Sequence, residues 1–331
     1  MLDDLLLYVN GQRHEVRGPD AFLSLSDYLR RVHGLVGTKI VCSEGDCGAC
    51  TVLIGRPAND GRRLIYRPVD SCIQFMLQLE GTHIITVEGL GSETQASAVQ
   101  QSMIECHGSQ CGFCTPGFVV AMAGLLEGHD TLDEPQMRRG LTGNLCRCTG
   151  YMPILDAGTH VDTARHERME ALYSSGEMLA ELESRRHQLI EMRAEWCGEA
   201  HVFASPPNLA SALEYLHAHP DATIVAGATD VGVRINKTNS LPKIILDLNR
   251  VAELDGIWIE DGTLALGSRA SWTAIERSCK DLVPEFHKIV ARFGAPQIRH
   301  VGTIGGNLAN ASPIADSLPF LFVMDAELEF A

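Results

Sequence analysis

The sequence predicts an α+β chain with several domains, and three observations support this. At 331 residues the chain is long enough for two or three cores of roughly 100–150 residues each. A strand–turn–strand pattern opens the chain, whereas apolar residues recur at helical spacing after residue 90, and strand-like and helix-like segments alternate beyond residue 200. We therefore expect structured parts at 1–90, 91–160 and 201–331, with residues 161–200 as a helical linker.

The first part is expected to begin as a β-hairpin. An apolar run at 6–9 meets Asn10–Gly11, a dipeptide favoured in type I′ turns, before the chain returns. A short helix is predicted at 25–32, where apolar residues recur at helical spacing. Strand-like runs at 51–54 and 83–87 complete a mixed α+β unit. Because this unit is small for a self-sufficient core, a buried metal cluster would help it to fold.

The second part is predicted to be a four-helix unit. Apolar residues follow helical spacing at 99–106 and at 118–125. Thr131 and Glu134 match a capping box, which predicts the start of a third helix, and Pro153 suits the first turn of a fourth. The charged segment that follows has little turn chemistry, so we expect it to be a helical connector.

The third part is predicted to be α+β with two glycine-containing loops. Its strand-like and helical segments alternate along the chain, and a last strand-like run lies at 328–330. An ending inside such a run predicts that a C-terminal portion of this domain is missing. The expected strands are 224–226, 244–248, 257–259 and 264–266, and the expected helices are 271–279 and 283–293.

Composition narrows the classes of function. The formal net charge of −15 opposes binding to nucleic acid, which requires a basic surface. No segment approaches the roughly 18 apolar residues of a membrane helix, and the acidic start at Asp3 and Asp4 does not resemble a signal peptide. We therefore expect a cytoplasmic protein without a membrane partner. In a reducing compartment, eleven closely spaced cysteines favour metal ligation over disulfides.

Four cysteines near the N-terminus have the spacing of plant-type [2Fe–2S] ligands. The pattern is C-x₄-C-x₂-C followed by a distant fourth cysteine, and glycines between them allow backbone amides to approach the sulfurs. A structural zinc site or buried free thiols are the alternatives, although zinc knuckles usually present two C-x-x-C pairs. The four residues are Cys42, Cys47, Cys50 and Cys72.

A second group of four cysteines lies in the helical part. Cys111 and Cys114 form C-G-F-C at a helix start, and Cys146 and Cys148 follow in a glycine-bounded turn. The first pair alone would also suit a thioredoxin-like dithiol, but no βαβ pattern surrounds it. Four thiolates from one helical unit are sufficient for a second cluster. We assign no chemistry to the remaining cysteines, Cys106, Cys197 and Cys279.

Two glycine-containing segments in the third part are candidate phosphate loops. They read AGATD at 226–230 and GTIGGN at 302–307, and neither is the G-x-G-x-x-G of a Rossmann site. Backbone amides and threonine hydroxyls in such loops can bind a pyrophosphate. Similar turns also occur without any ligand.

Three motifs together resemble the iron–sulfur region of the xanthine dehydrogenase family of molybdenum hydroxylases. They are EGDCGACTV at 44–52, QCGFCTPG at 110–117 and GNLCRCTGY at 143–151, and the two glycine loops are similar to the flavin domain of the same family. The resemblance implies a plant-type ferredoxin β-grasp domain, a four-helix [2Fe–2S] domain and an incomplete α+β FAD-binding domain of the vanillyl-alcohol-oxidase (PCMH) type. It also implies that the eight clustered cysteines are the ligands.

The resemblance further implies the remaining cofactors and partners. A molybdopterin-binding large subunit would hydroxylate the substrate, and electrons would pass through both clusters to FAD and on to NAD, as in the small subunit of a bacterial xanthine dehydrogenase. Purines are then the leading substrates, with aldehydes or N-heterocycles as alternatives, while a zinc-stabilised binding module and a flavin-independent carrier are rivals of other classes. Carried over by motif, Gln110 would contact the partner's pterin and the FAD residues would be Ile224, Val225, Ala226, Gly227, Ala228, Thr229, Asp230, Val231, Phe293, Thr303, Ile304, Gly305, Gly306, Asn307 and Asp316.

Overall fold

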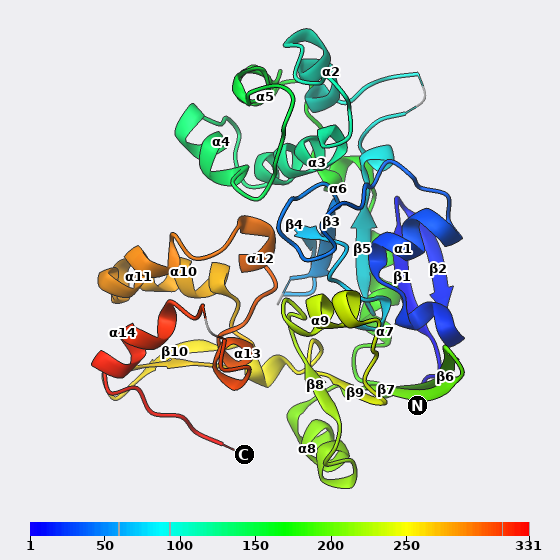
Figure 1. Ribbon diagram of the computed structural model, residues 1–331, viewed down its shortest axis with the longest axis vertical. Helices are drawn as coiled ribbons and strands as arrows, with labels where there is room; N and C mark the ends of the chain where they lie inside the picture. The colour runs from blue at the N-terminus through cyan, green and yellow to red at the C-terminus, as the bar shows by residue number, and fades with distance from the viewer. Residues whose placement is uncertain (59, 93, 313, 331) are drawn as a thin grey trace. The chain divides into compact units, whose positions relative to one another are not determined.

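The computed structural model describes residues 1–58, 60–92, 94–312 and 314–330. It divides into two compact units: residues 4–186 form one, and residues 1–3 with residues 187 onward form the other. Figure 1 labels the elements of both. The end of the predicted flavin domain, Ala331, lies outside the described residues.

A β-sheet with strand order β2-β1-β5-β3-β4 organises the start of the unit 4–186. β1 pairs with β2 in antiparallel and with β5 in parallel orientation, whereas β3 is antiparallel to both β4 and β5. Asn10 and Gly11 have φ of 48° and 79°, which confirms the predicted hairpin turn. Sequence reasoning missed β4. The strands are β1 Leu5–Val9, β2 Gln12–Val16, β3 Thr51–Pro57, β4 Leu64–Asp70 and β5 Thr82–Ile85.

Short helical turns connect these strands. The predicted helix at 25–32 is present as α1 (Leu25–Asp27), which continues into the π-helical turn η2 (Tyr28–Val32). The Ser24 hydroxyl caps α1 by accepting a hydrogen bond from the Asp27 backbone N–H. The other turns are the 3₁₀ segments η1 Gly18–Phe22, η3 Met76–Gln78 and η4 Val87–Leu90.

Four helices follow in the described residues 94–160, which confirms the predicted four-helix unit. They are α2 Ala98–Glu105, α3 Thr115–Leu126, α4 Glu134–Gly140 and α5 Met152–Thr159. The predicted capping box of α4 was placed two residues too early. The side chain of Asp133 accepts from the Gln136 backbone N–H at 2.8 Å, and the Gln136 side chain accepts from the Asp133 N–H at 2.9 Å. Asp133 therefore takes the capping position assigned to Thr131.

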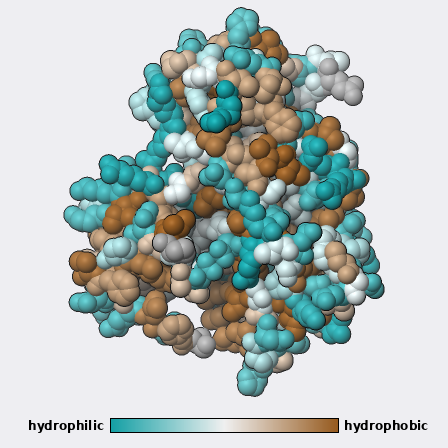
Figure 2. All heavy atoms as spheres, viewed as in Figure 1, coloured by the Kyte–Doolittle hydropathy of each residue, from teal (hydrophilic) through white to brown (hydrophobic). Residues whose placement is uncertain are grey.

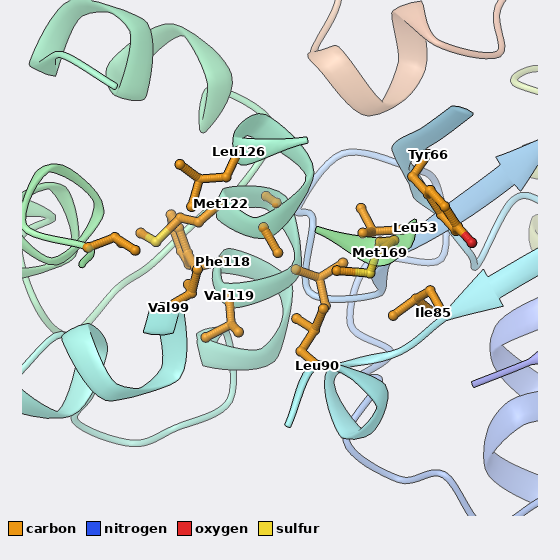
Figure 3. Close-up of a cluster of buried hydrophobic side chains, with 14 of the residues drawn as sticks. Leu53, Tyr66, Ile85, Leu90, Val99, Phe118, Val119, Met122, Leu126 and Met169 are labelled. Atoms are coloured by element: carbon orange, nitrogen blue, oxygen red, sulfur yellow. The ribbon is translucent and has the colours of Figure 1, made fainter. Parts of the chain in front are cut away.

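The sheet and the helices share one hydrophobic core. Helix α3 is its centre, with Phe118 and Met122 almost fully buried. Figure 3 shows Val99 of α2 on one side of α3 and Leu53 of β3 and Ile85 of β5 on the other. Burial of each such side chain contributes roughly 1.5–3 kcal/mol. The two cysteine-bearing parts of this unit are consequently held together by apolar packing.

The predicted helical linker is only partly helical. Its first half contains α6 (Met169–Leu172) and α7 (Gly176–Ser184), but Ile190–Trp196 is strand β6. This corrects the prediction of a helical linker through residue 200. In β6 the buried residues Ile190 and Met192 alternate with more exposed ones, a two-residue period that sequence reasoning overlooked because the segment is highly charged.

The second unit contains a sheet of strand order β6-β7-β9-β8 and a separate hairpin, β10 with β11. The strands predicted between residues 224 and 266 and the two helices predicted between residues 271 and 293 are confirmed, while β7 and several helices were not foreseen. Its remaining strands are β7 Glu199–Ser205, β8 Thr223–Val225, β9 Ile244–Asp247, β10 Ile257–Glu260 and β11 Thr263–Leu266. Its helices are α8 Leu209–Ala218, α9 Val231–Thr238, η5 Ala252–Leu254, α10 Trp272–Leu282, α11 Pro284–Val290, α12 Pro296–Arg299, α13 Ile304–Ala309 and α14 Ser317–Val323.

The strand predicted at 328–330 was wrong. Leu328 and Phe330 are exposed and the segment has no regular secondary structure. An alternating apolar pattern forms a strand only where a neighbouring strand pairs with it.

In the part of the chain that the structure describes, no helix is both long enough and apolar enough to span a membrane.

Candidate metal centres and flavin site

The structure brings the first four predicted cysteine ligands together at one end of the first sheet. Cys42, Cys47 and Cys50 lie in the loop that leads into β3, and Cys72 follows β4. The Cys42 thiol is in hydrogen-bonding contact with Cys47 and Cys72, and Cys72 also contacts Cys50. Cys50 and Cys72 are each only 2% exposed.

The environment of this group favours a negative charge on one of its sulfurs, that of Cys42. The pKa of Cys42 is lowered, first because the neighbouring thiols of Cys47 and Cys72 donate hydrogen bonds to it. Backbone N–H groups of Glu44 and Asp46 add to this effect, each at 3.5 Å from Cys42 Sγ. Amides directed at a thiolate are a common feature of iron–sulfur loops, where they tune the potential.

Asp70 is a polar neighbour that sequence reasoning missed. Its side chain is buried, and Cys50 Sγ donates to Asp70 Oδ1 at 3.7 Å. Burial raises the pKa of Asp70 to about 7, with the charge of Cys42 adding to the shift. A carboxylate at the end of a strand, two residues before a predicted ligand, was the signal that could have drawn attention to it.

The second four cysteines also meet, and they do so as two pairs. Cys148 Sγ lies 3.3 Å from Cys111 Sγ, while the Cys114 thiol donates to Cys146. Burial and then this hydrogen bond raise the pKa of Cys114 to about 12. Cys114 is the N-cap residue of α3, so a negatively charged group here lies at the favourable end of the helix dipole.

Residues around Cys146 shape the second site from outside the pairs. The Thr149 hydroxyl lies 3.1 Å from Cys146 Sγ, and the Cys146 backbone N–H donates to Tyr151 Oη at 3.0 Å. The backbone of Tyr151 has φ of 72°, in the left-handed region. Cys111 and Cys148 are exposed, unlike the buried pair of the first site.

Both sites fit a two-iron cluster. Each iron of a [2Fe–2S] cluster takes two thiolates, and the second site presents its four sulfurs as two contacting pairs. Among the residues that the structure describes, no group of three or more His, Cys, Asp or Glu side chains is arranged around a single metal-ion position.

Gln110 and several large apolar residues are exposed in the helical part that carries the second site. Gln110 is exposed directly before Cys111, and its predicted contact with a pterin stays a prediction. Large apolar side chains nearby are also exposed, including Phe113, Leu145 and Met152. Figure 2 shows hydrophobic residues at the surface of this helical part of the molecule.

The two predicted flavin loops pack against each other in the second unit. A Cβ on Gly227 would lie 2.0 Å from the Val301 carbonyl oxygen, so only glycine permits this approach. Asn249, which sequence reasoning did not identify, anchors the first loop by donating from Nδ2 to the Ala226 carbonyl oxygen at 2.8 Å. Ala228 has φ of 58°, which turns the chain toward α9.

The second loop begins helix α13. The Thr303 side chain caps this helix by accepting from the Gly306 N–H at 3.1 Å, and the Gly305 N–H donates to the Ser268 carbonyl oxygen at 2.8 Å. The Ser317 hydroxyl donates to Asn307 Oδ1 at 2.8 Å, which places Asp316 beside this loop. These hydrogen bonds fix the glycine-rich turn at the start of the helix.

Phe293 lies in the same region. Its ring packs edge-on against the Trp272 ring with the centroids 4.7 Å apart, and the Trp272 backbone N–H donates to the Gly302 carbonyl oxygen at 3.1 Å. The predicted flavin residues at 224–231 and 303–307 therefore lie on either side of one contact, in which Gly227 packs against Val301 and Gly302. Two packed turns with little side-chain bulk fit the pyrophosphate of a dinucleotide.

Comparison with protein families matches three successive domains. Residues 7–72 match a 2Fe-2S iron-sulfur cluster binding domain, and residues 86–159 match a [2Fe-2S] binding domain. Residues 198–331 match the FAD binding domain in molybdopterin dehydrogenase. The order is the one that the sequence motifs predicted.

Similar proteins include larger enzymes. Xanthine dehydrogenase 1 of Arabidopsis thaliana is 30% identical over 98% of this chain, and Aldehyde oxidase 4 of Cavia porcellus is 31% identical over 96% of it. This chain spans only 28% and 27% of those proteins. Among solved structures, a chain of quinoline 2-oxidoreductase from Pseudomonas putida 86 is 39% identical, with a TM-score of 0.42. The match covers 49% of the present chain and 93% of the quinoline 2-oxidoreductase chain.

These matches agree with the cofactors expected from the motifs. The chain has two 2Fe-2S domains and an FAD-binding domain, while molybdopterin belongs to the other part of its relatives. All three are domains of an oxidoreductase, and together they match most of the sequence. The chain belongs to the xanthine dehydrogenase family of molybdenum hydroxylases and corresponds to the N-terminal iron–sulfur and flavin part of its longer members.

Proposed function

We propose that this chain carries electrons from a molybdenum centre on a partner subunit, through two [2Fe–2S] clusters, to FAD. The observation that carries the proposal is the convergence of eight cysteines, distant in sequence, into two separate groups of contacting sulfurs. The proposed ligands are Cys42, Cys47, Cys50 and Cys72 for the first cluster, and Cys111, Cys114, Cys146 and Cys148 for the second.

The residues of the chain would bind and tune these groups. When bound, the clusters carry single electrons and FAD exchanges one or two. Backbone amides of Glu44 and Asp46 would donate to a cluster thiolate, and the burial of Cys50 would exclude water from the first cluster. The loops at 224–231 and 303–307, with Phe293 and Asp316, would hold FAD. No side chain of this chain is proposed as a general base or nucleophile.

The partner, substrate and acceptor are also proposals. Relatives three to four times longer carry molybdopterin elsewhere, which supports a molybdopterin-binding large subunit that Gln110 would contact. The names xanthine dehydrogenase, aldehyde oxidase and quinoline 2-oxidoreductase support a purine, an aldehyde or an N-heterocycle as substrate, and we favour xanthine or hypoxanthine. We further propose NAD as the acceptor, in the cytoplasm, where reduced cysteines can bind metal.

An anaerobic titration with NADH tests the proposal without the partner. We expect NADH to reduce the FAD and then to bleach the visible absorption of the clusters, since electrons would flow backward along the same route. Bleaching by dithionite but not by NADH would reject NAD as the acceptor and leave the carrier role in place. A colourless chain with stoichiometric zinc would reject the carrier role and favour the zinc-stabilised binding module.

A further inference from the structure

The carboxyl ends of three parallel strands lie together in the second unit, beside the first glycine loop. β9 pairs in parallel with β7 on one side and with β8 on the other (Figure 1). The three strands end at Ser205, Val225 and Asp247, and the loop at 226–230 directly follows β8. In α/β proteins, ligands usually bind at the carboxyl ends of parallel strands.

A polar cluster formed by Ser205, Asp247 and Asn249 connects these strand ends. Ser205 and Asp247 are buried. The Asp247 carboxylate accepts from the Ser205 hydroxyl at 2.9 Å and from Asn249 Nδ2 at 2.7 Å. The Asn249 backbone N–H also donates to this carboxylate, at 3.3 Å. Because a buried carboxylate without donors is costly, the cluster fixes the orientation of the Asn249 amide.

Asn249 extends this cluster to the glycine loop. Its Nδ2 donates to the Ala226 carbonyl oxygen at 2.8 Å as well as to Asp247. The Leu248 backbone N–H donates to the Val225 carbonyl oxygen at 2.9 Å. One side-chain amide therefore joins the buried carboxylate of β9 to the main chain of the loop, next to the point where the main chains of the two strands are already bonded.

The loop that Asn249 holds is strained and closely packed. Ala228 has φ of 58°, a left-handed conformation that is unfavourable for a residue with a Cβ. A Cβ on Gly227 would lie 2.0 Å from the Val301 carbonyl oxygen, so the backbones of the two loops are in contact. A strained turn persists only where surrounding contacts determine its shape, and such turns are typical of ligand-binding sites. The hydrogen bond from Asn249 is one of these contacts.

We infer that Asn249 is a positioning residue for FAD, which holds the loop at 226–230 in its binding shape through the Ala226 carbonyl oxygen. A loop that is ordered in advance loses less conformational entropy on binding, so its affinity for the ligand is higher. Asn249 acts through the main chain of the loop and requires no contact with FAD. The inference rests on the proposed function, because it takes this loop as part of the FAD site.

The test separates loop positioning from folding by exchanging two side chains in the full chain. Asn249→Asp removes the donor to Ala226 and places two carboxylates side by side. Asn249→Asp combined with Asp247→Asn, the exchanged variant, restores an amide–carboxylate pair and the original net charge, but it leaves position 249 without a side-chain donor for Ala226. Asn239→Asp is the control, because it makes the same chemical change at an exposed residue that ends α9.

FAD affinity and stability are measured on flavin-free chains. Quenching of flavin fluorescence gives the Kd for FAD, which should rise about fivefold in Asn249→Asp and in the exchanged variant, as expected for one lost net hydrogen bond. The denaturant midpoint should fall in Asn249→Asp and return close to its original value in the exchanged variant. Hydrogen exchange of the amides at 226–230, without FAD, should be faster in both. Asn239→Asp should match the unmodified chain throughout.

A purely structural role would restore affinity and stability together in the exchanged variant, and that result would overturn the inference. An unchanged Kd in Asn249→Asp would also overturn it and leave the FAD site standing. If Asn249→Asp does not fold, the exchanged variant decides, and a failure of both to fold would show that Asn249 serves the fold rather than FAD. An unmodified chain that binds no FAD would overturn the FAD site of the proposed function, and the inference with it.

Discussion

The two cysteine sites differ in how deeply the protein encloses them. The first site is framed by β-strands, with Cys50 and Cys72 each 2% exposed and Asp70 buried beside them. The second lies at the start of α3, and both members of its Cys111–Cys148 pair are exposed. A buried cluster is shielded from solvent, whereas an exposed one can be approached by another redox centre. Under the proposed function, the first site would be an internal relay and the second would be open to a partner.

The largest expected effect on stability comes from adding a side chain at Gly48, where the loops of the two cysteine sites meet. Gly48→Ala should destabilise the chain by more than about 3 kcal/mol, because the new Cβ meets backbone atoms in addition to the strain of positive φ. Gly150→Ala is the matched control, since Gly150 has φ of 70° but no atom within 4 Å of a Cβ. It should cost only about 1 kcal/mol. Chemical denaturation measures the free energy of unfolding of both variants. Equal losses would show that Gly48 is not tightly packed against the Gly143 carbonyl oxygen.

Removing one ligand from each site should separate the two by stability. Cys72→Ser and Cys148→Ser should each reduce the iron content from about four to about two per chain, because each disrupts one cluster. Cys72→Ser should lower the melting temperature further, since it places a hydroxyl in a buried site. Iron analysis and thermal unfolding measure this. A larger loss for Cys148→Ser would reverse the comparison of burial.

Acid should destabilise the chain mainly through the first β-sheet, because this sheet contains the buried His83. His83 of β5 is fully buried, its Nε2 accepts from the Gly11 N–H at 3.0 Å, and burial lowers its pKa to about 4. In the unfolded chain its pKa is near 6.5, so the unfolded state takes up a proton as pH falls below this value while the folded state does not. Stability should therefore fall by about 2 kcal/mol between pH 7 and pH 5 from this residue alone.

His83→Gln provides the comparison for the acid effect. The variant should lose this part of the pH dependence, as shown by denaturation curves at the two pH values. The same acid sensitivity in His83→Gln as in the unmodified chain would assign it to other buried groups.

The sequence predicted the site better than the frame around it. Cysteine spacing and glycine placement are local signals, so the grouping of the eight cysteines, the Asn10–Gly11 turn and the four helices could be foreseen. Strand β4 and the hairpin of β6 and β7 could not, because Pro68 interrupts β4 and the charged residues of β6 mask an alternation that becomes meaningful only through pairing. Asp70 and Asn249 were missed for a related reason, since their roles depend on partners 20 and 23 residues away in sequence.

An EPR spectrum of the chain reduced with dithionite tests the central claim most directly. Because the first site is buried and the second is partly exposed, the two clusters should give two distinct [2Fe–2S] signals. Together these signals should account for about two spins per chain. The signal that disappears in Cys148→Ser should be the one that persists in Cys72→Ser. A single signal of about one spin per chain, or none with zinc in place of iron, would contradict the claim that the eight cysteines hold two clusters.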